Sequence, residues 1–238
     1  MFVAALLYSS VGHAGASGYL AAMALFDVNP AVMRPTALLL NLIVASIGTM
    51  KFYRAGHFSW PLFWPFAAAS APFAFLGGTI SLPTTVYRPL LGAVLLYSAA
   101  RLALEDRSFA DAPEAIRPVR RGAALALGAV IGLVAGLTGV GGGIFLSPLL
   151  LLMRWAPTRT TAAVSVAFIL ANSVAGLTGQ MLSLPPLPRL APVWAVVAAA
   201  GGWIGSHWGS RKLPSAALRR LLAIVLLVAG GKLLMPRP

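Results

Sequence analysis

The stretch GLTGVGGGIFLSP, from Gly136 to Pro148, places a cluster of glycines inside an apolar segment with no charged side chain between Gly122 and Met153. Glycine costs about 1 kcal/mol relative to alanine in a helix interior. As one helix the segment would span about 48 Å, whereas the hydrocarbon core of a bilayer is about 30 Å thick. It therefore predicts two short helices joined by a glycine turn, with one tilted or kinked helix as the alternative.

The composition of the whole chain sets its class. Of its 238 residues, 59% are hydrophobic and 10% are charged. A soluble domain carries about 25% charged residues, so this composition predicts an integral membrane protein. The apolar runs are continuous rather than alternating, which favours helices over the strands of an outer-membrane barrel. The chain has no cysteine, which excludes disulfides and thiolate chemistry.

The second half of the chain repeats the first. PTTVYRPLLGAVLLYSAARL at residues 83–102 aligns without gaps with PSAALRRLLAIVLLVAGGKL at residues 214–233. Leucine-rich helices match partly by chance, but here a proline and basic residues also match. We expect a first transmembrane repeat over 1–104, a polar linker over 105–119 and a second transmembrane repeat over 120–238.

Two further features recur in both halves. Asn41 and Asn172 stand 131 residues apart, the same separation as the aligned segments. VGHAGASGYLA, at residues 11–21, occupies in the first half the place of the glycine cluster. At an offset nearer 124 residues, the first-half cluster aligns with the second as follows: Gly15, Ser17 and Gly18 fall near Gly139, Gly141 and Gly142.

The basic residues indicate how the apolar segments cross the membrane. Each half has four such segments, at about 2–26, 35–53, 59–81, 84–103, 122–153, 160–181, 190–210 and 215–235. If every segment crosses the membrane once, 10 of the 18 Lys and Arg lie on one side of the membrane and 8 on the other. If the first segment of each half is a re-entrant hairpin, 13 lie on one side and 5 on the other. The positive-inside rule favours the hairpins and a cytoplasmic linker.

The hairpin arrangement predicts the fold class. A hairpin plus three crossings is an odd number, so the two halves insert in opposite orientations. We therefore expect an all-α integral membrane protein of two inverted repeats, each with four helical segments, the first of which is a glycine-broken helix or a re-entrant hairpin. Inverted repeats with broken helices near the midplane are typical of secondary transporters.

The glycine turns are the candidate binding site. Non-helical backbone at that depth persists where it is buried in protein or lines a wet cavity. Backbone N–H groups at turns and half-helix starts attract anions. The candidate substrate-binding residues are Gly15, Ser17, Gly18, Asn41, Thr138, Gly139, Gly141, Gly142, Gly143 and Asn172. The alternative for the glycines is close helix packing, and the alternative for the two asparagines is hydrogen bonding between helices.

Other glycines have the four-residue spacing of helix-packing motifs, which bring two backbones together. We expect packing alone at Gly128, Gly132, Gly136, Gly201, Gly205 and Gly209.

The titratable groups are few. No Asp or Glu falls inside a predicted span, which disfavours antiport through a buried carboxylate. His13 lies at predicted depth; it could relay a proton or touch an anion, or it could be a neutral, hydrogen-bonded turn residue. The basic residues are scattered between apolar runs, which indicates contact with the lipid bilayer rather than with nucleic acid.

The sequence does not favour an enzyme. GVGGG is not followed by the Lys-Ser/Thr of a P-loop, and no strand–helix unit of a dinucleotide site accompanies it. The sequence also contains no nucleophile–base pair and no metal-binding cluster. We expect no catalytic residue, no cofactor and no metal.

Three stretches resemble the sulfite exporter TauE/SafE family: GLTGVGGGIFLSPLLL, AVSVAFILANSVAG and YRAGHFSWPLFWPFAAASAPFAFLGG. The resemblance implies a small bacterial or archaeal inner-membrane protein that moves sulfite or organosulfonates, usually outward. By motif match it assigns the second-half turn to Gly139, Gly141, Gly142, Gly143 and Pro148, and the first-half turn to Gly15, Ser17 and Gly18. The first-half stretch GHAGASGY departs from the family by replacing a glycine triplet and adding His13.

These observations favour a carrier that alternates access to a small anion held between the two glycine turns. A passive anion channel and a non-transporting scaffold are the alternatives. The sequence leaves open the exact substrate, the direction of transport, the coupling ion and whether the protein forms a homo-oligomer.

Overall fold

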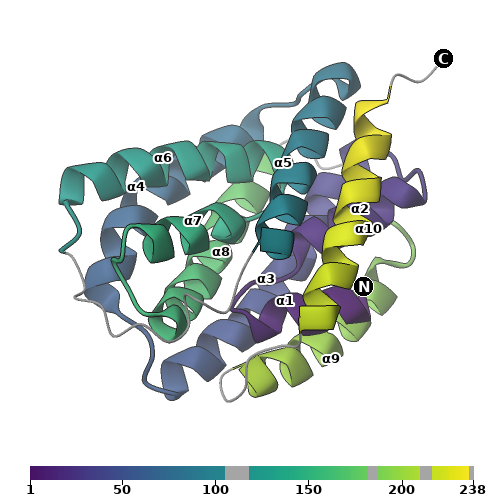
Figure 1. The fold of residues 1–238 in the computed structure, drawn as a ribbon. Helices are drawn as coiled ribbons and strands as arrows, with labels where there is room; N and C mark the ends of the chain where they lie inside the picture. Colours follow the sequence, from purple (N-terminus) through teal and green to yellow (C-terminus); the bar gives the residue numbers. More distant parts are fainter. Residues whose placement is uncertain (105–117, 182–186, 210–215, 236–238) are drawn as a thin grey trace.

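The computed structural model of the protein describes residues 1–104, 118–181, 187–209 and 216–235, whose regular structure is helical (Figure 1). The prediction of an all-α fold is confirmed. The helices are α1 (Phe2–Ser10), α2 (Ala16–Leu25), α3 (Pro30–Arg54), α4 (Trp60–Thr79), α5 (Thr84–Leu104), α6 (Arg121–Thr138), α7 (Gly143–Leu152), α8 (Thr158–Gln180), α9 (Ala191–Gly209) and α10 (Ala216–Leu234).

Several of these helices are apolar enough to cross a bilayer. By length and composition α3, α6 and α8 qualify among the described residues. Shorter apolar helices are α2, α7 and the part of α10 from Ala223 to Leu234. Residues 105–117 of the predicted linker lie outside the described residues, so the division into domains stays a prediction.

The first apolar segment of each half is broken at its glycines. Gly12 and Gly15 interrupt the first half with φ of 80° and 103°, and Gly139 and Gly142 interrupt the second with 81° and 84°. Residues with a side chain rarely adopt these left-handed values. A continuous helix was therefore the wrong alternative. Gly12 corresponds to Gly139 and Gly15 to Gly142, which makes the offset three residues longer than the sequence alignment suggested.

The chain reverses direction at the second break. In Figure 1, α6 runs toward the interior and α7 runs back, so that the start of α6 and the end of α7 lie on the same side of the molecule. The start of α8 lies on this side too. The helix directions therefore follow the hairpin arrangement, while the inversion of the repeats across a bilayer stays a prediction.

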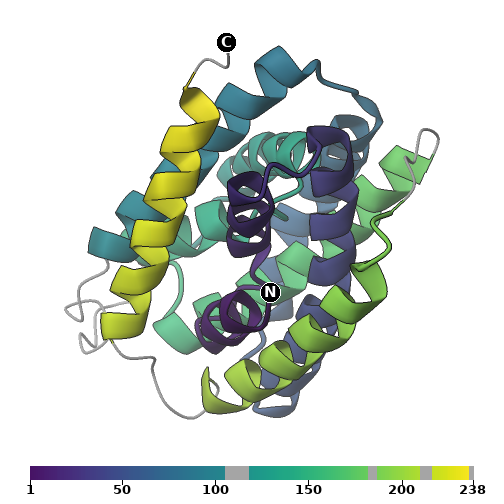
Figure 2. The same cartoon turned by 90° about the vertical axis from the view of Figure 1, so that its right-hand side faces the viewer.

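The two halves pack against each other with matching partners. Helix α6 packs on α4, and the corresponding α1 packs on α9. Helix α3 packs on its counterpart α8, and α5 packs on its counterpart α10, beside which it runs in Figures 1 and 2. Exchanging the halves thus maps these contacts onto one another, in accord with the predicted duplication.

Glycines allow two of these helix pairs to approach closely. A methyl group on them would overlap a backbone carbonyl of the facing helix. The facing pairs are Gly128 with Phe66, Gly132 with Ser70, Gly136 with Ala74, Gly201 with Phe2, and Gly205 with Leu6. The packing prediction is confirmed for these five glycines, whereas the surroundings of Gly209 lie outside the described part of the chain.

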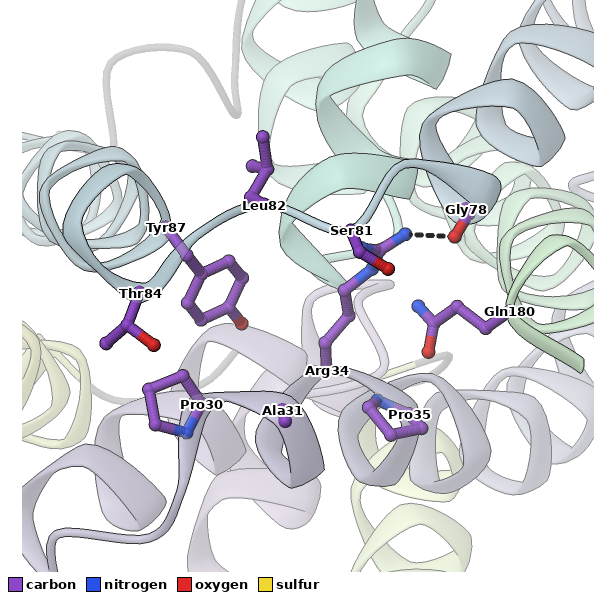
Figure 3. A pocket seen from close by; sticks show the side chains of 10 residues that line it. All are labelled: Pro30, Ala31, Arg34, Pro35, Gly78, Ser81, Leu82, Thr84, Tyr87 and Gln180. Carbon is purple, nitrogen blue, oxygen red and sulfur yellow. Dashed lines mark hydrogen bonds between the residues drawn. The ribbon is translucent and has the colours of Figure 1, made fainter. Parts of the chain in front are cut away.

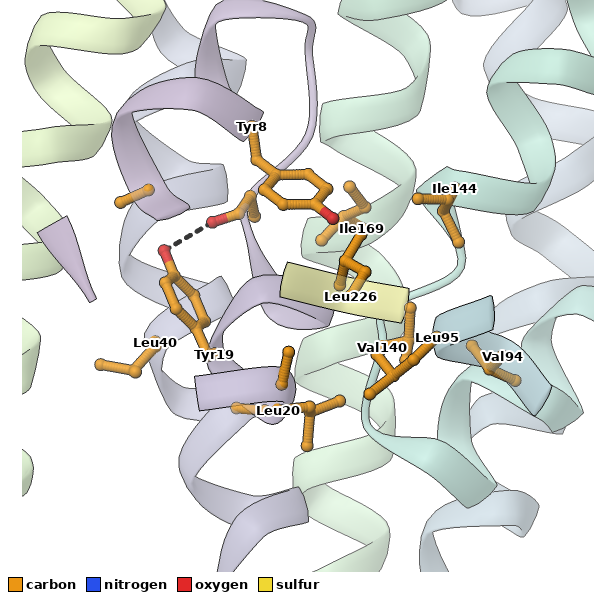
Figure 4. Packing of buried hydrophobic residues seen from close by; sticks show 14 of the residues in the cluster. Tyr8, Tyr19, Leu20, Leu40, Val94, Leu95, Val140, Ile144, Ile169 and Leu226 are labelled. Carbon is orange, nitrogen blue, oxygen red and sulfur yellow. Dashed lines mark hydrogen bonds between the residues drawn. The ribbon is translucent and has the colours of Figure 1, made fainter. Parts of the chain in front are cut away.

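The two breaks share one hydrophobic core, shown in Figure 4. Tyr8 and Tyr19 flank the first break, whereas Val140 lies within the second break and Ile144 follows it at the start of α7. Ile169 of α8 packs in the same cluster. Segments that are far apart in the sequence therefore meet in the interior.

Candidate functional site

A small cavity of about 10 Å³ lies where the two breaks meet. That is about the room one water molecule needs. Its walls include Ala16 and Ser17 at the start of α2, and Val140 and Ile144 at the second break. The remaining lining residues are Tyr8, His13, Ala14, Gly15 and Ile169.

The starts of two short helices contribute to this cavity. Helices α2 and α7 begin after Gly15 and Gly142, both with left-handed φ, and neither helix has a side-chain cap. The first N–H groups of a helix have no partner inside the helix, and they carry the positive end of its dipole. Two helix starts of this kind, one from each half, can donate to one small anion.

Two asparagines hold the second break in place. The Nδ2 of Asn172 donates to the carbonyl of Gly141 at 3.3 Å, and the Nδ2 of Asn41 donates to that of Val140 at 3.4 Å. The C=O and N–H of a trans peptide point in opposite directions, so these contacts also orient the N–H groups of Gly141 and Gly142. The hydroxyl of Ser70 donates to Oδ1 of Asn172 at 2.7 Å, so that asparagine bonds between helices.

Asn41 keeps unused hydrogen-bonding capacity. It is completely buried, and its Oδ1 has no hydrogen-bond partner. The hydrogen bond from its side-chain amide to the carbonyl of Val140 joins the first half of the chain to the second. Asn41 therefore combines a structural contact with a free acceptor at the second break.

His13 connects the first break to the second half. Its Nε2 lies 3.1 Å from Oγ of Ser147, and this hydroxyl donates to Oγ of Ser165 at 2.8 Å. Because a serine hydroxyl has one hydrogen, the Nε2 of His13 must then be the donor to Ser147. The Nδ1 of His13 is left as an acceptor, and it is buried without a partner.

Several predicted residues lie beside the cavity rather than in its wall. Gly18 packs against Ala4, and Gly139 packs against Arg34. The hydroxyl of Thr138 donates to the carbonyl of Val134 within α6 at 2.7 Å.

The glycines at the start of α7 lie close to the polar side chains of the second break. Gly141 lies against Asn41, Gly142 against Asn172, and Gly143 against the His13 ring. The structure therefore brings these three glycines together with both asparagines and His13.

Arg34 falls just before the segment expected at 35–53, yet it lies in the second turn of α3 and is 8% exposed. Its guanidinium donates to three carbonyls at the end of α4: Gly77 at 2.6 Å, Gly78 at 2.6 Å and Ile80 at 2.8 Å. The signal for this earlier helix start was Asn29-Pro30, because asparagine favours the N-cap and proline the first turn. The Oδ1 of Asn29 indeed accepts from the N–H of Ala31 at 2.9 Å.

Comparison with known proteins extends the resemblance to almost the whole chain. The profile of the family described as sulfite exporter TauE/SafE matches residues 1–233. No solved structure matches the chain significantly.

Two relatives carry the name of probable membrane transporter proteins. The protein y4hK of Sinorhizobium fredii (strain NBRC 101917 / NGR234) is 46% identical over 236 residues, which cover 98% of this chain and 95% of the relative. The protein YunE of Bacillus subtilis (strain 168) is 27% identical over 113 residues, which cover 46% of this chain and 40% of the relative. The chain is thus a multi-pass membrane protein rather than an enzyme, and it belongs to the sulfite exporter TauE/SafE family of membrane transporters.

Proposed function

We propose that this transporter exports a small sulfur-containing anion, such as sulfite or an organosulfonate, across the inner membrane of a bacterium or archaeon. The family description supports this class of substrate. The distribution of Lys and Arg supports a cytoplasmic position for the linker.

The anion binds where the starts of α2 and α7 meet. The observation that carries this proposal is that two uncapped helix starts, one from each half, line the same buried cavity. No acidic side chain lines that cavity among the described residues. Backbone N–H groups of the turns and the Ser17 hydroxyl donate to the anion. Asn41 and Asn172 act by holding the second turn, and His13 acts through its contact with Ser147.

Transport requires the cavity to open. With room for about one water, it is too small for sulfite, so this conformation is closed around the site. Rocking of one repeat against the other separates the two breaks and exposes the site to each side of the membrane in turn.

The test is efflux of sulfite from proteoliposomes, with sulfate and taurine-type sulfonates as competitors. We expect saturable efflux that is lost when Asn41→Ala and Asn172→Ala are combined. The matched control combines Ser46→Ala with Thr178→Val, because these exposed hydroxyls lie on the same two helices and bond only to their own helix. Gel filtration verifies that each purified variant is folded.

Three results would contradict the proposal. Efflux that does not saturate would indicate a passive channel. Normal efflux by the folded variant with both asparagine substitutions would contradict the location of the binding site between the two breaks. Absence of efflux for every sulfur anion would remove the substrate class.

A further inference from the structure

A second, larger cavity of about 200 Å³ lies between the starts of α3 and α5 and the ends of α4 and α8 (Figure 3). Polar side chains in its wall are Arg34, Tyr87, Gln180, Ser81 and Thr84. One water needs about 10–15 Å³ of such space, so the cavity has room for a small oxyanion together with water.

The charge of Arg34 has no carboxylate partner in the described part of the chain. The chain has five acids: Asp27 pairs with Lys232 at 2.8 Å, and the other four fall within 105–117, outside the described residues. The three hydrogen bonds of Arg34 go to neutral carbonyls, and its Nε is buried without a partner. A buried charge is costly unless it is paired, so the site is suited to an anion.

Gln180 supplies a second unused donor to the same cavity. This last residue of α8 is 6% exposed, and its Nε2 is buried without a hydrogen-bond partner. In Figure 3 the Gln180 amide and the Tyr87 hydroxyl are turned toward Arg34 from opposite sides. Buried donors are normally satisfied, and an anion that bridges Arg34 and Gln180 would satisfy both.

The cavity adjoins the second break. The hydroxyl of Tyr87 donates to the carbonyl of Thr138 at 3.2 Å, and Thr138 directly precedes the break. A Cβ built on Gly139 would lie 3.1 Å from Cγ of Arg34. The same residues therefore form the cavity wall and contact the turn that borders the central site.

We propose that this pocket is a second binding site for a small oxyanion, held by Arg34 and Gln180, between the central site and the side of the membrane opposite the linker. Its place in the transport path rests on the proposed export function. The binding itself does not, because the unpartnered donors and the cavity are present whatever the direction of transport.

The test is calorimetric titration of the purified wild-type protein in detergent with sulfite and, separately, with sulfate. We expect Gln180→Leu to raise Kd by about tenfold or more, since a hydrogen bond to a charged group is lost. The melting temperature of this variant should stay the same or rise, because the leucine removes a buried amide nitrogen that has no hydrogen-bond partner. Arg34→Gln should weaken binding further, while Arg159→Gln, an exposed arginine at the start of α8, serves as the charge-matched control.

An unchanged Kd in folded Gln180→Leu, or no binding of either anion to the wild type, would overturn the proposal that this pocket binds an oxyanion. Arg34 caps α4, so Arg34→Gln alone could fail by unfolding; Gln180→Leu avoids this because its amide nitrogen has no partner to lose. Weaker binding in Gln180→Leu without sulfite efflux in the wild type would leave the pocket standing and contradict only the export function. Normal sulfite efflux in the wild type, together with an unchanged Kd in Gln180→Leu, would support the export function and contradict the pocket as a binding site.

A phospholipid headgroup presents the same oxyanion chemistry as a free anion. The titration is therefore repeated in nanodiscs of phosphatidylcholine alone and with phosphatidylglycerol. Equal sulfite affinity in both supports a free anion as the occupant. Loss of sulfite binding when phosphatidylglycerol is present would identify the headgroup as the occupant and overturn the transport role of the pocket.

Discussion

The side-chain amide of Asn172 donates to the carbonyl of Gly141 at 3.3 Å and thereby attaches the second glycine break to the middle of α8. The other end of the same amide accepts the Ser70 hydroxyl from α4. One side chain thus connects the break to two helices that come from different halves of the chain. A hydrophobic residue at this position would leave both partners buried and unpaired.

Asn172→Leu should therefore lower the free energy of unfolding more than Asn41→Leu. We expect a loss of about 1–3 kcal/mol for Asn172→Leu, the cost of leaving buried polar groups unsatisfied. Asn41→Leu should cost less, because the Asn41 bond is longer, at 3.4 Å, and its Oδ1 already has no partner. Denaturant unfolding in detergent measures both variants, and the opposite order would contradict this account.

Gly132→Ala should destabilise the contact between α6 and α4. A methyl group there would overlap the carbonyl of Ser70, and overpacking typically costs about 1–3 kcal/mol. Gly122→Ala, at the start of the same helix, is the control, because its added methyl meets nothing within 4 Å. Its stability should stay equal or rise by up to about 1 kcal/mol through helix propensity. Similar midpoints of thermal unfolding for both variants would refute the close approach.

Ser147→Ala should be more destabilising than Ser165→Ala. Ser147 is the middle member of the chain from His13 to Ser165, so its loss leaves both neighbours without that partner. We expect a cost of about 1–3 kcal/mol for Ser147→Ala. Ser165→Ala leaves the His13 contact intact and should cost less. Chemical denaturation of the two variants decides the order. An equal loss of unfolding free energy would argue against a hydrogen-bonded series from His13 through Ser147 to Ser165.

The direction reversal at the second break can be tested by labelling single cysteines in the cysteine-free chain. In intact cells, a membrane-impermeant maleimide should label Ser81→Cys but neither Ser108→Cys in the linker nor Met153→Cys at the end of α7. Permeabilised cells, in which all three should react, are the control. Labelling of Met153→Cys but not Ser108→Cys from outside would mean that α6 and α7 together cross the membrane.

The elements of this fold were predictable because they depend on local chemistry. Long apolar runs without charge predict helices in lipid, and the glycines of GVGGG and VGHAG predict breaks because left-handed backbone favours glycine. The four-residue spacing of glycines identified close contacts on α6 and α9, although not their partners. The first-half alignment was off by three residues because glycine-rich turns have few side chains to set the register.

The sequence by itself determined that the protein is helical, belongs in a membrane and is interrupted at two glycine clusters, and it predicted two repeats, since each inference follows from residue type and spacing along the chain. Only the tertiary structure decided that the two breaks meet at one cavity and that Asn41 and Asn172 both hold the second break. It also decided that Arg34 is buried beside Gln180. These relationships join residues far apart in the sequence, and they depend on which helix faces pack together.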